Sequence, residues 1–309
     1  MSPPSSQTAP ATSSGPAEAG LLAVLAVVWG QLFVSLSTAW REGTYYSFGW
    51  FVAPISVYFF WRRWQLRPPP TRITIATAPS PSWFVVASGA IVAAAILLFA
   101  RVTFADSPGW RLPAWIHAAL VVAAHHALLG LAAGRSTSIF LAPVTVFALS
   151  AVPYPMRLEV PLVHSLTGMV AAVCREVFLM VGVPVSVVGE QLSLEGQNVA
   201  VTDGCSGLRS IQSLLMAALF FGELFWLSWP RRLALVAIAM SAAVITNAGR
   251  ALWLAWTHFR HGAATMDRWH DTAGHTAFAA GCALLLAAAF ALHPRARRRI
   301  VSRRAAQPA

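Results

Sequence analysis

Apolar positions along the chain gather in long runs that short polar stretches separate. Most runs are about 16 to 25 residues long, which is the length that a helix needs to cross a bilayer core about 30 Å thick. The pattern predicts spanning helices at about 19–37, 44–61, 83–100, 113–133, 137–152, 208–229, 232–256 and 273–293.

A further apolar run, at about 161–183, is harder to assign because it carries His164, Arg175 and Glu176, which are costly at mid-bilayer. The arginines elsewhere resolve the ambiguity, since the positive-inside rule assigns Arg-rich loops to the cytoplasm. Counting 161–183 as a full span would place the Arg-rich segments on opposite sides of the membrane. These segments carry Arg62, Arg63, Arg67 and Arg72 after the second run, Arg231 and Arg232 before 232–256, and Arg295, Arg297, Arg298, Arg299, Arg303 and Arg304 in the tail.

The sequence therefore predicts an all-α, polytopic integral membrane protein with about eight transmembrane helices and one interfacial or re-entrant helix. Both termini are expected in the cytoplasm. Residues 1–17, rich in Ser, Pro, Ala and Thr, are typical of a disordered N-terminal tail. The membrane-embedded domain is predicted to take 18–294, and 295–309 to form an Arg-rich cytoplasmic tail.

Composition agrees with this class and narrows the partners. Hydrophobic residues make up 57% of the 309 residues and charged residues 11%, less than half of the roughly 25% that is usual in a soluble protein. All 22 basic residues are Arg, against 11 Asp and Glu, which gives a net charge of +11. They lie mostly between apolar runs, and no soluble basic domain or aromatic platform is present to bind nucleic acid. We expect a lipid bilayer, and no nucleic acid, among the partners.

The predicted topology brings three reactive residues to the outer face. The loop at about 184–207, which contains Cys205, opens there. Arg250 lies about 18 residues into a helix that begins inside, which at 1.5 Å per residue is roughly 27 Å, close to the outer surface. His270 is expected in the next outer loop, just before the last span.

Cys205 lies in a setting that suits a nucleophile, between two glycines in Gly204-Cys205-Ser206-Gly207 and just before a helix. The free amides and the dipole at a helix N-terminus lower the pKa of a thiol and favour the thiolate. The same amides can hold an oxyanion. The other cysteines, Cys174 and Cys282, lie inside helical stretches, and the three together form neither a disulfide framework nor a zinc motif.

His270 is a candidate base that a cysteine nucleophile needs, with Asp267 or Asp271 to orient it. Spacing alone does not separate it from the neighbouring histidines, which are His258, His261 and His275. Arg250 is a functional candidate because an arginine within an apolar helix is costly, although near a helix end it can also extend to the head groups. From the residues alone, the hypothesis is Cys-dependent acyl transfer at the outer surface.

Several motifs then occur together in one order along the chain. They are Gly182-Val183-Pro184-Val185, a strand-like approach ending at Val199-Ala200-Val201, Cys205-Ser206-Gly207-Leu208-Arg209, Asn247-x-x-Arg250, and His270 followed by Gly274. Over about 178–282 the chain resembles the exosortase/archaeosortase family of membrane cysteine transpeptidases. Nearer the N-terminus, Tyr46-Ser47-Phe48-Gly49 also resembles a motif of the family, with Phe48 where the family usually has His.

This resemblance implies a role for each site residue. Cys205 is the nucleophile on a substrate peptide bond, His270 the acid and base, and Arg250 the group that stabilises charge or positions the carbonyl. Family spacing favours His270 over His275 as the base. The further substrate-binding candidates are Ser206, Arg209 and Asn247. No cofactor and no metal are expected.

The resemblance also implies the partners and the location. Family substrates are exported proteins with a C-terminal tripartite sorting signal, made of a Pro-Glu-Pro-like motif (PEP-CTERM type), a transmembrane helix and a basic cluster. The enzyme is then expected in the bacterial inner membrane with its active site facing the periplasm, alongside exopolysaccharide production. An acidic motif suits a site lined by Arg209 and Arg250, with Arg260 and Arg268 nearby.

Three other functions remain open from the sequence. A metal-dependent membrane hydrolase would use Asp267, Asp271 and the histidines near them, which are His258, His261, His270 and His275. No His-Glu-x-x-His motif is present, however. A non-catalytic transporter or assembly scaffold of the envelope fits the intramembrane charges, but no repeat pairs the two halves. A serine peptidase centred on Ser206 lacks the Gly-x-Ser-Gly arrangement of rhomboids.

Overall fold

The computed structural model describes residues 15–42, 45–69, 83–107, 109–188, 191–194, 197–200 and 207–293. Within these ranges the chain is mostly helical. The helices are α1 (Pro16–Glu42), α2 (Gly49–Gln65), α3 (Trp83–Asp106), α4 (Leu112–Ala133), α5 (Arg135–Leu149), α6 (Met156–Met180), α7 (Leu208–Leu224), α8 (Trp229–His261) and α9 (Ala263–Leu292). The strands are β1 (Val185–Val188), β2 (Gln191–Leu194) and β3 (Gln197–Ala200).

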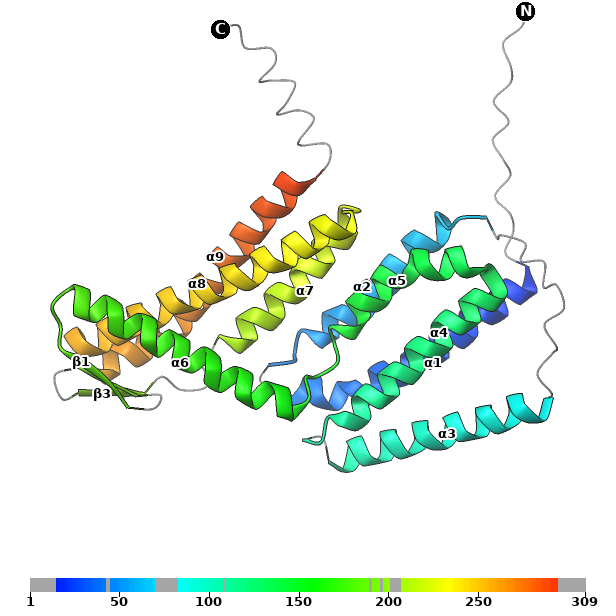
Figure 1. Ribbon diagram of the computed structural model, residues 1–309, viewed down its shortest axis with the longest axis horizontal. Helices are drawn as coiled ribbons and strands as arrows, with labels where there is room; N and C mark the ends of the chain where they lie inside the picture. The colour runs from blue at the N-terminus through cyan, green and yellow to red at the C-terminus, as the bar shows by residue number, and fades with distance from the viewer. Residues whose placement is uncertain are drawn as a thin grey trace, which may run out of the picture.

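Each apolar run that the sequence singled out forms a helix, which confirms the helical pattern. The helices form two groups that lie beside each other, α1–α5 and α6–α9, and the described ends of the chain lie at the same end of the molecule (Figure 1). Most of the predicted N-terminal tail (1–14) and the whole Arg-rich tail (295–309) lie outside the described residues. Residues 16 and 17, assigned to the tail from sequence, belong to α1.

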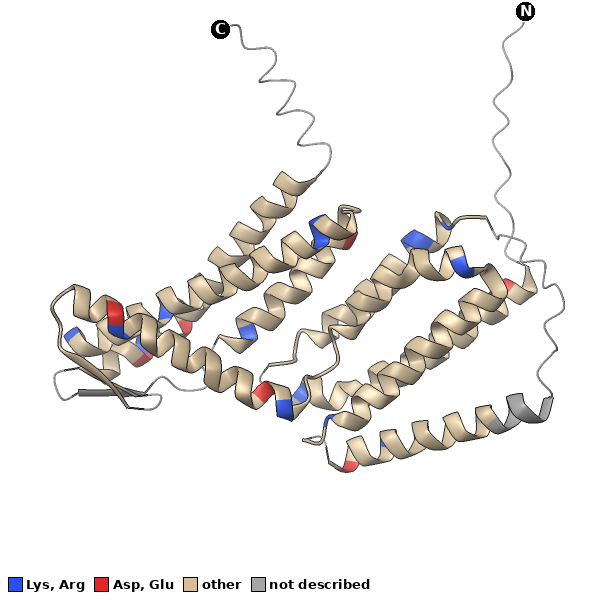
Figure 2. Cartoon of the chain, viewed as in Figure 1, with Lys and Arg blue, Asp and Glu red and all other residues tan. Residues whose placement is uncertain are grey.

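A buried ion cluster joins the two groups at the end of the molecule where the described ends of the chain lie. Glu223 of α7 is fully buried and pairs with Arg63 of α2 and with Arg232 of α8, the latter at 2.9 Å. Arg63, after the second run, and Arg232, before 232–256, therefore meet at one end of the described helices, while their cytoplasmic location stays a prediction. Arg63 and Arg232 are buried ion-pair partners, which the positive-inside rule did not anticipate. Charged residues of the described chain gather toward the ends of the helices, as Figure 2 shows.

A second polar cluster lies at the opposite end of the helices. The Tyr46 hydroxyl, in the turn between α1 and α2, donates to Glu159 in the first turn of α6 and accepts from the backbone N–H of Tyr154 at 2.9 Å. Arg111, just before α4, pairs with Glu159 and donates to the Tyr154 carbonyl at 3.1 Å. Burial, and then the bond to Glu159, raise the pKa of the Tyr46 hydroxyl well above its ordinary value, so it stays protonated and remains a donor.

Helix α6 packs at this second end along its whole length. Its first turn holds Glu159, which accepts from Tyr46, and its C-terminal half packs on Ala251 and Ala255 of α8. It also runs obliquely to α7, α8 and α9 (Figure 1). The sequence predicted an interfacial or re-entrant helix at 161–183, and its boundaries in the structure are 156–180.

Length and composition alone identify spanning candidates among the described helices. They are Pro16–Arg41, Leu112–Ala133, Met156–Met180, Trp229–His261 and Ala263–Leu292. The protein is thus a multi-pass membrane protein. These candidates include α6. They do not include α2 and α7, which are shorter, with 17 residues each. The count of eight spans stays a prediction.

Helices α8 and α9 differ most from the expected boundaries. Ser228 and Pro230 give α8 a favourable start, and the helix continues to His261, where Gly262 turns the chain with φ +80°. Helix α9 begins at once, at Ala263. The expectation that His270 lies in a loop before the last span was therefore wrong, because the polar residues on either side of Gly262 extend two helices.

The length of α8 also changes the setting of Arg250. Its 33 residues make a helix of about 50 Å, longer than a bilayer core of about 30 Å. Arg250 is followed by a further stretch of helix to His261, so it is not at a helix end, where a charge most easily reaches the head groups. The polar stretch after it forms a hairpin with the start of α9.

A small antiparallel sheet, in the order β1-β2-β3, follows α6. Val185 pairs with Leu194, and Gln191 with Ala200. Leu192 and Leu194 of β2 are fully buried in a core that they share with Phe178 of α6 and with α8. The predicted all-α class thus holds except for this sheet, of which the sequence indicated only the strand-like approach near Val199.

Candidate active site

Arg250 and His270 lie in direct contact between α8 and α9. The Arg250 Nη2 atom lies 3.0 Å from His270 Nε2. A guanidinium only donates hydrogen bonds, so Nε2 is the acceptor and carries no proton. The proton of the neutral imidazole is then on Nδ1, which faces Asp271 Oδ1 at 3.1 Å. The contact therefore holds His270 in one neutral tautomer.

Gly274 lies against the same guanidinium, one turn after His270 on α9. A Cβ built on Gly274 would lie 3.6 Å from Arg250 Cζ, which is ordinary van der Waals contact. Residues four apart on a helix share a face. The pair His270 and Gly274, singled out from the sequence by its spacing, thus presents one face of α9 to Arg250.

The start of α7 is pressed against α8 one turn before Arg250. Gly207 precedes α7 in the left-handed region, with φ +80°, and a Cβ there would lie 2.6 Å from Asn247 Cγ. Only glycine fits, because both the backbone conformation and the space exclude a side chain. Asn247 is 3% exposed, and it fixes where the chain enters α7.

Not every predicted site residue can be placed. Cys205 and Ser206 lie outside the described residues. Arg209, in the first turn of α7, is exposed, and Asn247 is buried against Gly207. The structure therefore brings together Asn247, Arg250 and His270 with the residue that ends the Cys205-Ser206-Gly207 motif.

Of the further charged residues named around the site, Asp271 contacts His270, and the other three are less closely involved. Arg260, Arg268 and Asp267 are exposed, and Arg260 lies over the ring of Trp256 at 5.6 Å. Of the two aspartates proposed to orient His270, the one in contact with it is Asp271. His275 is exposed on α9, and the contact that the structure describes for Arg250 on α9 is with His270.

A groove of about 360 Å³ runs along the outside of α8 and α9 and includes Arg250. Trp253 and Trp269, 53% and 47% exposed, flank it on the polar side of Arg250. Its small-residue floor and its threonines comprise Gly249, Ala273, Ala277, Ala280, Thr246, Thr272 and Thr276. Small residues at helix surfaces let another helix approach closely.

Sequence reasoning missed this groove and the acidic partner of the N-terminal motif. The signal for the groove was the spacing of Ala273, Ala277 and Ala280, which places them on one helix face. Glu159 gave a weaker signal, as an acidic residue just before the apolar run at 161–183. Its partner Tyr46 belongs to the N-terminal motif Tyr46-Ser47-Phe48-Gly49. The adjacent Tyr45 packs against the hydrophobic cluster that includes Leu208 of α7.

The described residues also bear on a metal site. Among them, no group of three or more His, Cys, Asp or Glu side chains is arranged to hold a metal ion. The histidines and aspartates around Gly262 all fall within the described helices α8 and α9. They are therefore not gathered into the ligand set that a metal-dependent hydrolase needs.

The sequence profile of the family described as transmembrane exosortase matches residues 40–287. The chain belongs to the transmembrane exosortase family. Exosortases are generally membrane cysteine transpeptidases that act on exported proteins. The match takes in the turn with Tyr46, the candidate site and most of α9. A search of the curated proteins gave no match, and neither did a search of the solved structures.

Proposed function

We propose that this exosortase is a cysteine transpeptidase or protease. It recognises a C-terminal sorting signal of the PEP-CTERM type on exported proteins and cleaves it at the outer face of the inner membrane. The observation that carries the proposal is the contact of Arg250 with His270 beside the start of α7. That helix follows directly on Cys205-Ser206-Gly207 in the sequence.

Chain connectivity supports Cys205 as the nucleophile. Gly207 is held against Asn247, and Asn247 lies one turn before Arg250 on α8. Two residues of chain span at most about 7 Å, so the Cα of Cys205 is no farther than that from the Cα of Gly207. The proposal assigns Cys205 to the site with Arg250 and His270 on this connection along the chain.

The reaction proceeds through a thioester. His270 takes the proton of the Cys205 thiol, and the thiolate attacks the carbonyl carbon of the scissile peptide bond, forming a C–S bond. The C–N bond then breaks, and the leaving amine takes the proton back from His270. An amine acceptor then attacks the thioester carbonyl and gives a proton to His270, the C–S bond breaks, and the Cys205 thiolate takes that proton back, which completes transpeptidation. Water in place of the amine gives hydrolysis.

Arg250 acts in two stages of this scheme. Before reaction it donates to His270 Nε2 and holds the imidazole neutral with Nε2 as the basic atom. When Nε2 accepts the thiol proton, the two cations repel, and Arg250 releases the ring. Its N–H groups then become available to the oxyanion that develops on the scissile carbonyl.

The groove beside Arg250 suits the transmembrane helix of the sorting signal. It runs along the outside of α8 and α9 from the two tryptophans toward Thr246 and Ala280, with small residues that allow a close helix contact. A substrate helix there brings the peptide bond just outside the membrane to Arg250. The acidic part of the signal then meets Arg250 and the exposed Arg209.

Processing of a tagged substrate with a C-terminal tripartite signal tests the proposal. We compare cells that carry wild type, Cys205→Ala, Cys205→Ser and the matched control Cys282→Ala, with membrane levels confirmed for each. We expect wild type and Cys282→Ala to shorten the substrate and both Cys205 variants to leave it intact. Equal processing by all four would overturn thiol catalysis at Cys205.

Two further arms identify the competing functions. Full activity of Cys205→Ser together with loss in Ser206→Ala would instead indicate a serine peptidase. Chelator sensitivity together with an active Cys205→Ala would indicate a metal-dependent hydrolase. Unchanged envelope assembly in both Cys205→Ala and Arg250→Ala would indicate a scaffold or a transporter.

A further inference from the structure

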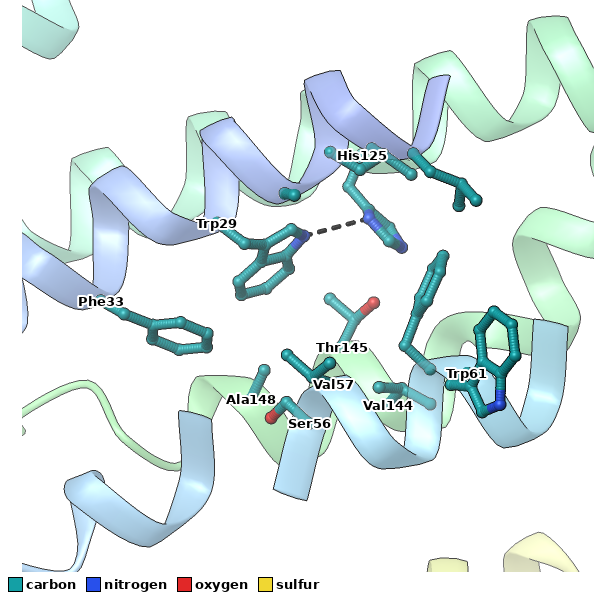
Figure 3. Close-up of a pocket in the computed structure, with 13 residues that line it drawn as sticks. Trp29, Phe33, Ser56, Val57, Trp61, His125, Val144, Thr145 and Ala148 are labelled. Carbon is teal, nitrogen blue, oxygen red and sulfur yellow. Dashed lines mark hydrogen bonds between the residues drawn. The ribbon is translucent and has the colours of Figure 1, made fainter. Parts of the chain in front are cut away.

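A second cavity lies in the N-terminal helix group, among α1, α2, α4 and α5. Its volume is about 250 Å³. The walls that Figure 3 shows are mainly apolar and aromatic, with Trp29 and Phe33 from α1, and Val144 and Ala148 from α5. None of its lining residues belongs to the candidate active site. The proposed transpeptidase activity makes no use of it.

The mouth of the cavity faces the outside of the helix group. Among its lining residues, Val57 and Trp61 of α2 are 65% and 55% exposed, and Ala26 of α1 is exposed as well. Leu25 and Val144 are buried deeper in the walls. Helices α1 and α4 are both candidate membrane spans, so the mouth opens toward lipid chains and away from water.

Polar groups on two helices face into this apolar space. The Trp29 indole N–H donates to His125 Nδ1 at 3.0 Å. Indole nitrogen can only donate, so Nδ1 carries no proton, and a neutral His125 carries its proton on Nε2. Thr145, 4% exposed, has a hydroxyl with no hydrogen-bond partner among the described residues. Figure 3 shows His125 and Thr145 on opposite sides of the same space.

The depth of His125 and Thr145 in the bilayer determines which molecules can reach them. His125 and Thr145 each lie about ten residues from the turn at Gly134 that joins α4 to α5. At 1.5 Å per residue this is roughly 15 Å, near the middle of a bilayer core about 30 Å thick. A phospholipid head group does not reach this depth, and an apolar cavity of this kind does not hold water stably.

We propose that this cavity binds a membrane lipid whose apolar chain carries a hydroxyl or carbonyl oxygen. The chain enters between α1 and α2 and fills the space lined by Trp29 and Ala148. Its oxygen accepts from His125 Nε2–H and forms a hydrogen bond with the Thr145 hydroxyl. Pockets that recognise small molecules combine mostly apolar walls with a few placed polar groups in this way.

Photocrosslinking in the purified full chain tests the proposal. The probes are a fatty alcohol with a mid-chain diazirine, and a phosphatidylcholine with the same diazirine on an acyl chain. We expect the alcohol to label peptides of α1, α2, α4 and α5 in wild type. Thr145→Val removes the hydroxyl at nearly constant shape and should lower this labelling roughly fivefold, as expected for one hydrogen bond in an apolar setting.

Thr167→Val is the matched control, because Thr167 of α6 is also buried with a hydroxyl that has no hydrogen-bond partner among the described residues. We expect it to label as wild type does. Ala148→Leu, which fills the cavity, should lower labelling independently of the hydroxyl. Equal labelling of wild type and Thr145→Val, or equal use of the phosphatidylcholine probe at the same peptides, would overturn the proposal.

Native mass spectrometry of wild type, Thr145→Val and Thr167→Val identifies the source of the ligand. A retained fatty alcohol and a retained isoprenoid alcohol differ in mass, and either supports the proposal if Thr145→Val loses it and Thr167→Val keeps it. Retention that does not depend on Thr145 contradicts it. Failure of this test leaves the Cys205 experiment unaffected, since the two use different residues and different readouts.

Discussion

Arg250 determines which nitrogen of His270 carries a proton. Because the guanidinium has five donors and no acceptor, its contact with Nε2 leaves that nitrogen deprotonated and ready to take a proton. Asp271 faces the other nitrogen and completes the orientation. In the proposed mechanism Arg250 then has two uses, because proton transfer to Nε2 would release the guanidinium for the oxyanion.

Replacing Arg250 by lysine tests this coupling. Lysine keeps the charge but loses the planar fork that reaches both the imidazole and an oxyanion. We expect Arg250→Lys to lower the rate of substrate processing by about a hundredfold, measured as the conversion rate of a tagged substrate at matched membrane levels. The control is Arg268→Lys, at an exposed site two residues before His270, and it should process normally. A normal rate for Arg250→Lys would show that only its charge matters.

At the scale of the elements, the α8–α9 hairpin carries most of the described site. One glycine, Gly262, with φ +80°, joins the two helices, which keeps them antiparallel and in register. Arg250 and His270 face each other across this pair, and the groove follows the same two helices. A substrate helix that lies in the groove is aligned with the two residues that are proposed to act on it.

Blocking the groove tests whether the substrate helix lies there. Ala277→Phe fills the floor of the groove, and we expect processing to fall at least about tenfold because the helices can no longer approach closely. Ala279→Phe is the control, since Ala279 lies at the same depth on another face of α9 and is exposed. Processing by detergent-solubilised enzyme measures both. Equal rates for the two variants would place the substrate helix elsewhere.

The sequence predicted the helices well and their ends less well. Long apolar runs can bury their backbone polar groups in a bilayer only as helices, so every run was found. The ends of α8 and α9 were missed because His258, His261 and Asp267 are polar. Polar residues indicate exposure to water, which is typical of a loop. A helix that continues beyond the membrane is exposed to water as well, so polarity does not mark its end. The strands β1 and β2 are too short for their alternation to be distinctive.

For the site, the sequence suggested candidate residues but not how they contact one another. The order Cys205, Arg250, His270 and the predicted topology already placed the three at one face. The contact of Nη2 with Nε2, and the packing of Gly207 on Asn247, join residues that lie 20 and 40 positions apart. Such contacts depend on how α7, α8 and α9 pack, and no local pattern records that.

At the scale of the whole molecule, the two helix groups are joined near both ends. The Tyr46, Arg111 and Glu159 cluster links the N-terminal turns to α6 beside the site. At the other end, Glu223 of α7 links α2 to α8 through two arginines. The core between these clusters is apolar, so the clusters specify how α1–α5 dock on α6–α9.

The ion cluster at Glu223 should therefore control stability without contributing to the reaction. Glu223→Gln leaves Arg63 and Arg232 buried beside a neutral amide, and breaking a buried pair costs on the order of 3–5 kcal/mol. We expect the midpoint of thermal unfolding in detergent to fall by at least about 5 °C, with substrate processing per folded enzyme unchanged. Glu176→Gln is the control, because its ion pair with Arg175 is exposed and contributes at most about 1 kcal/mol. If Glu223→Gln unfolds at the same temperature as wild type, the apolar core sets the docking of the two groups. If it also loses processing, the cluster acts on the distant site through the α7 and α8 helices.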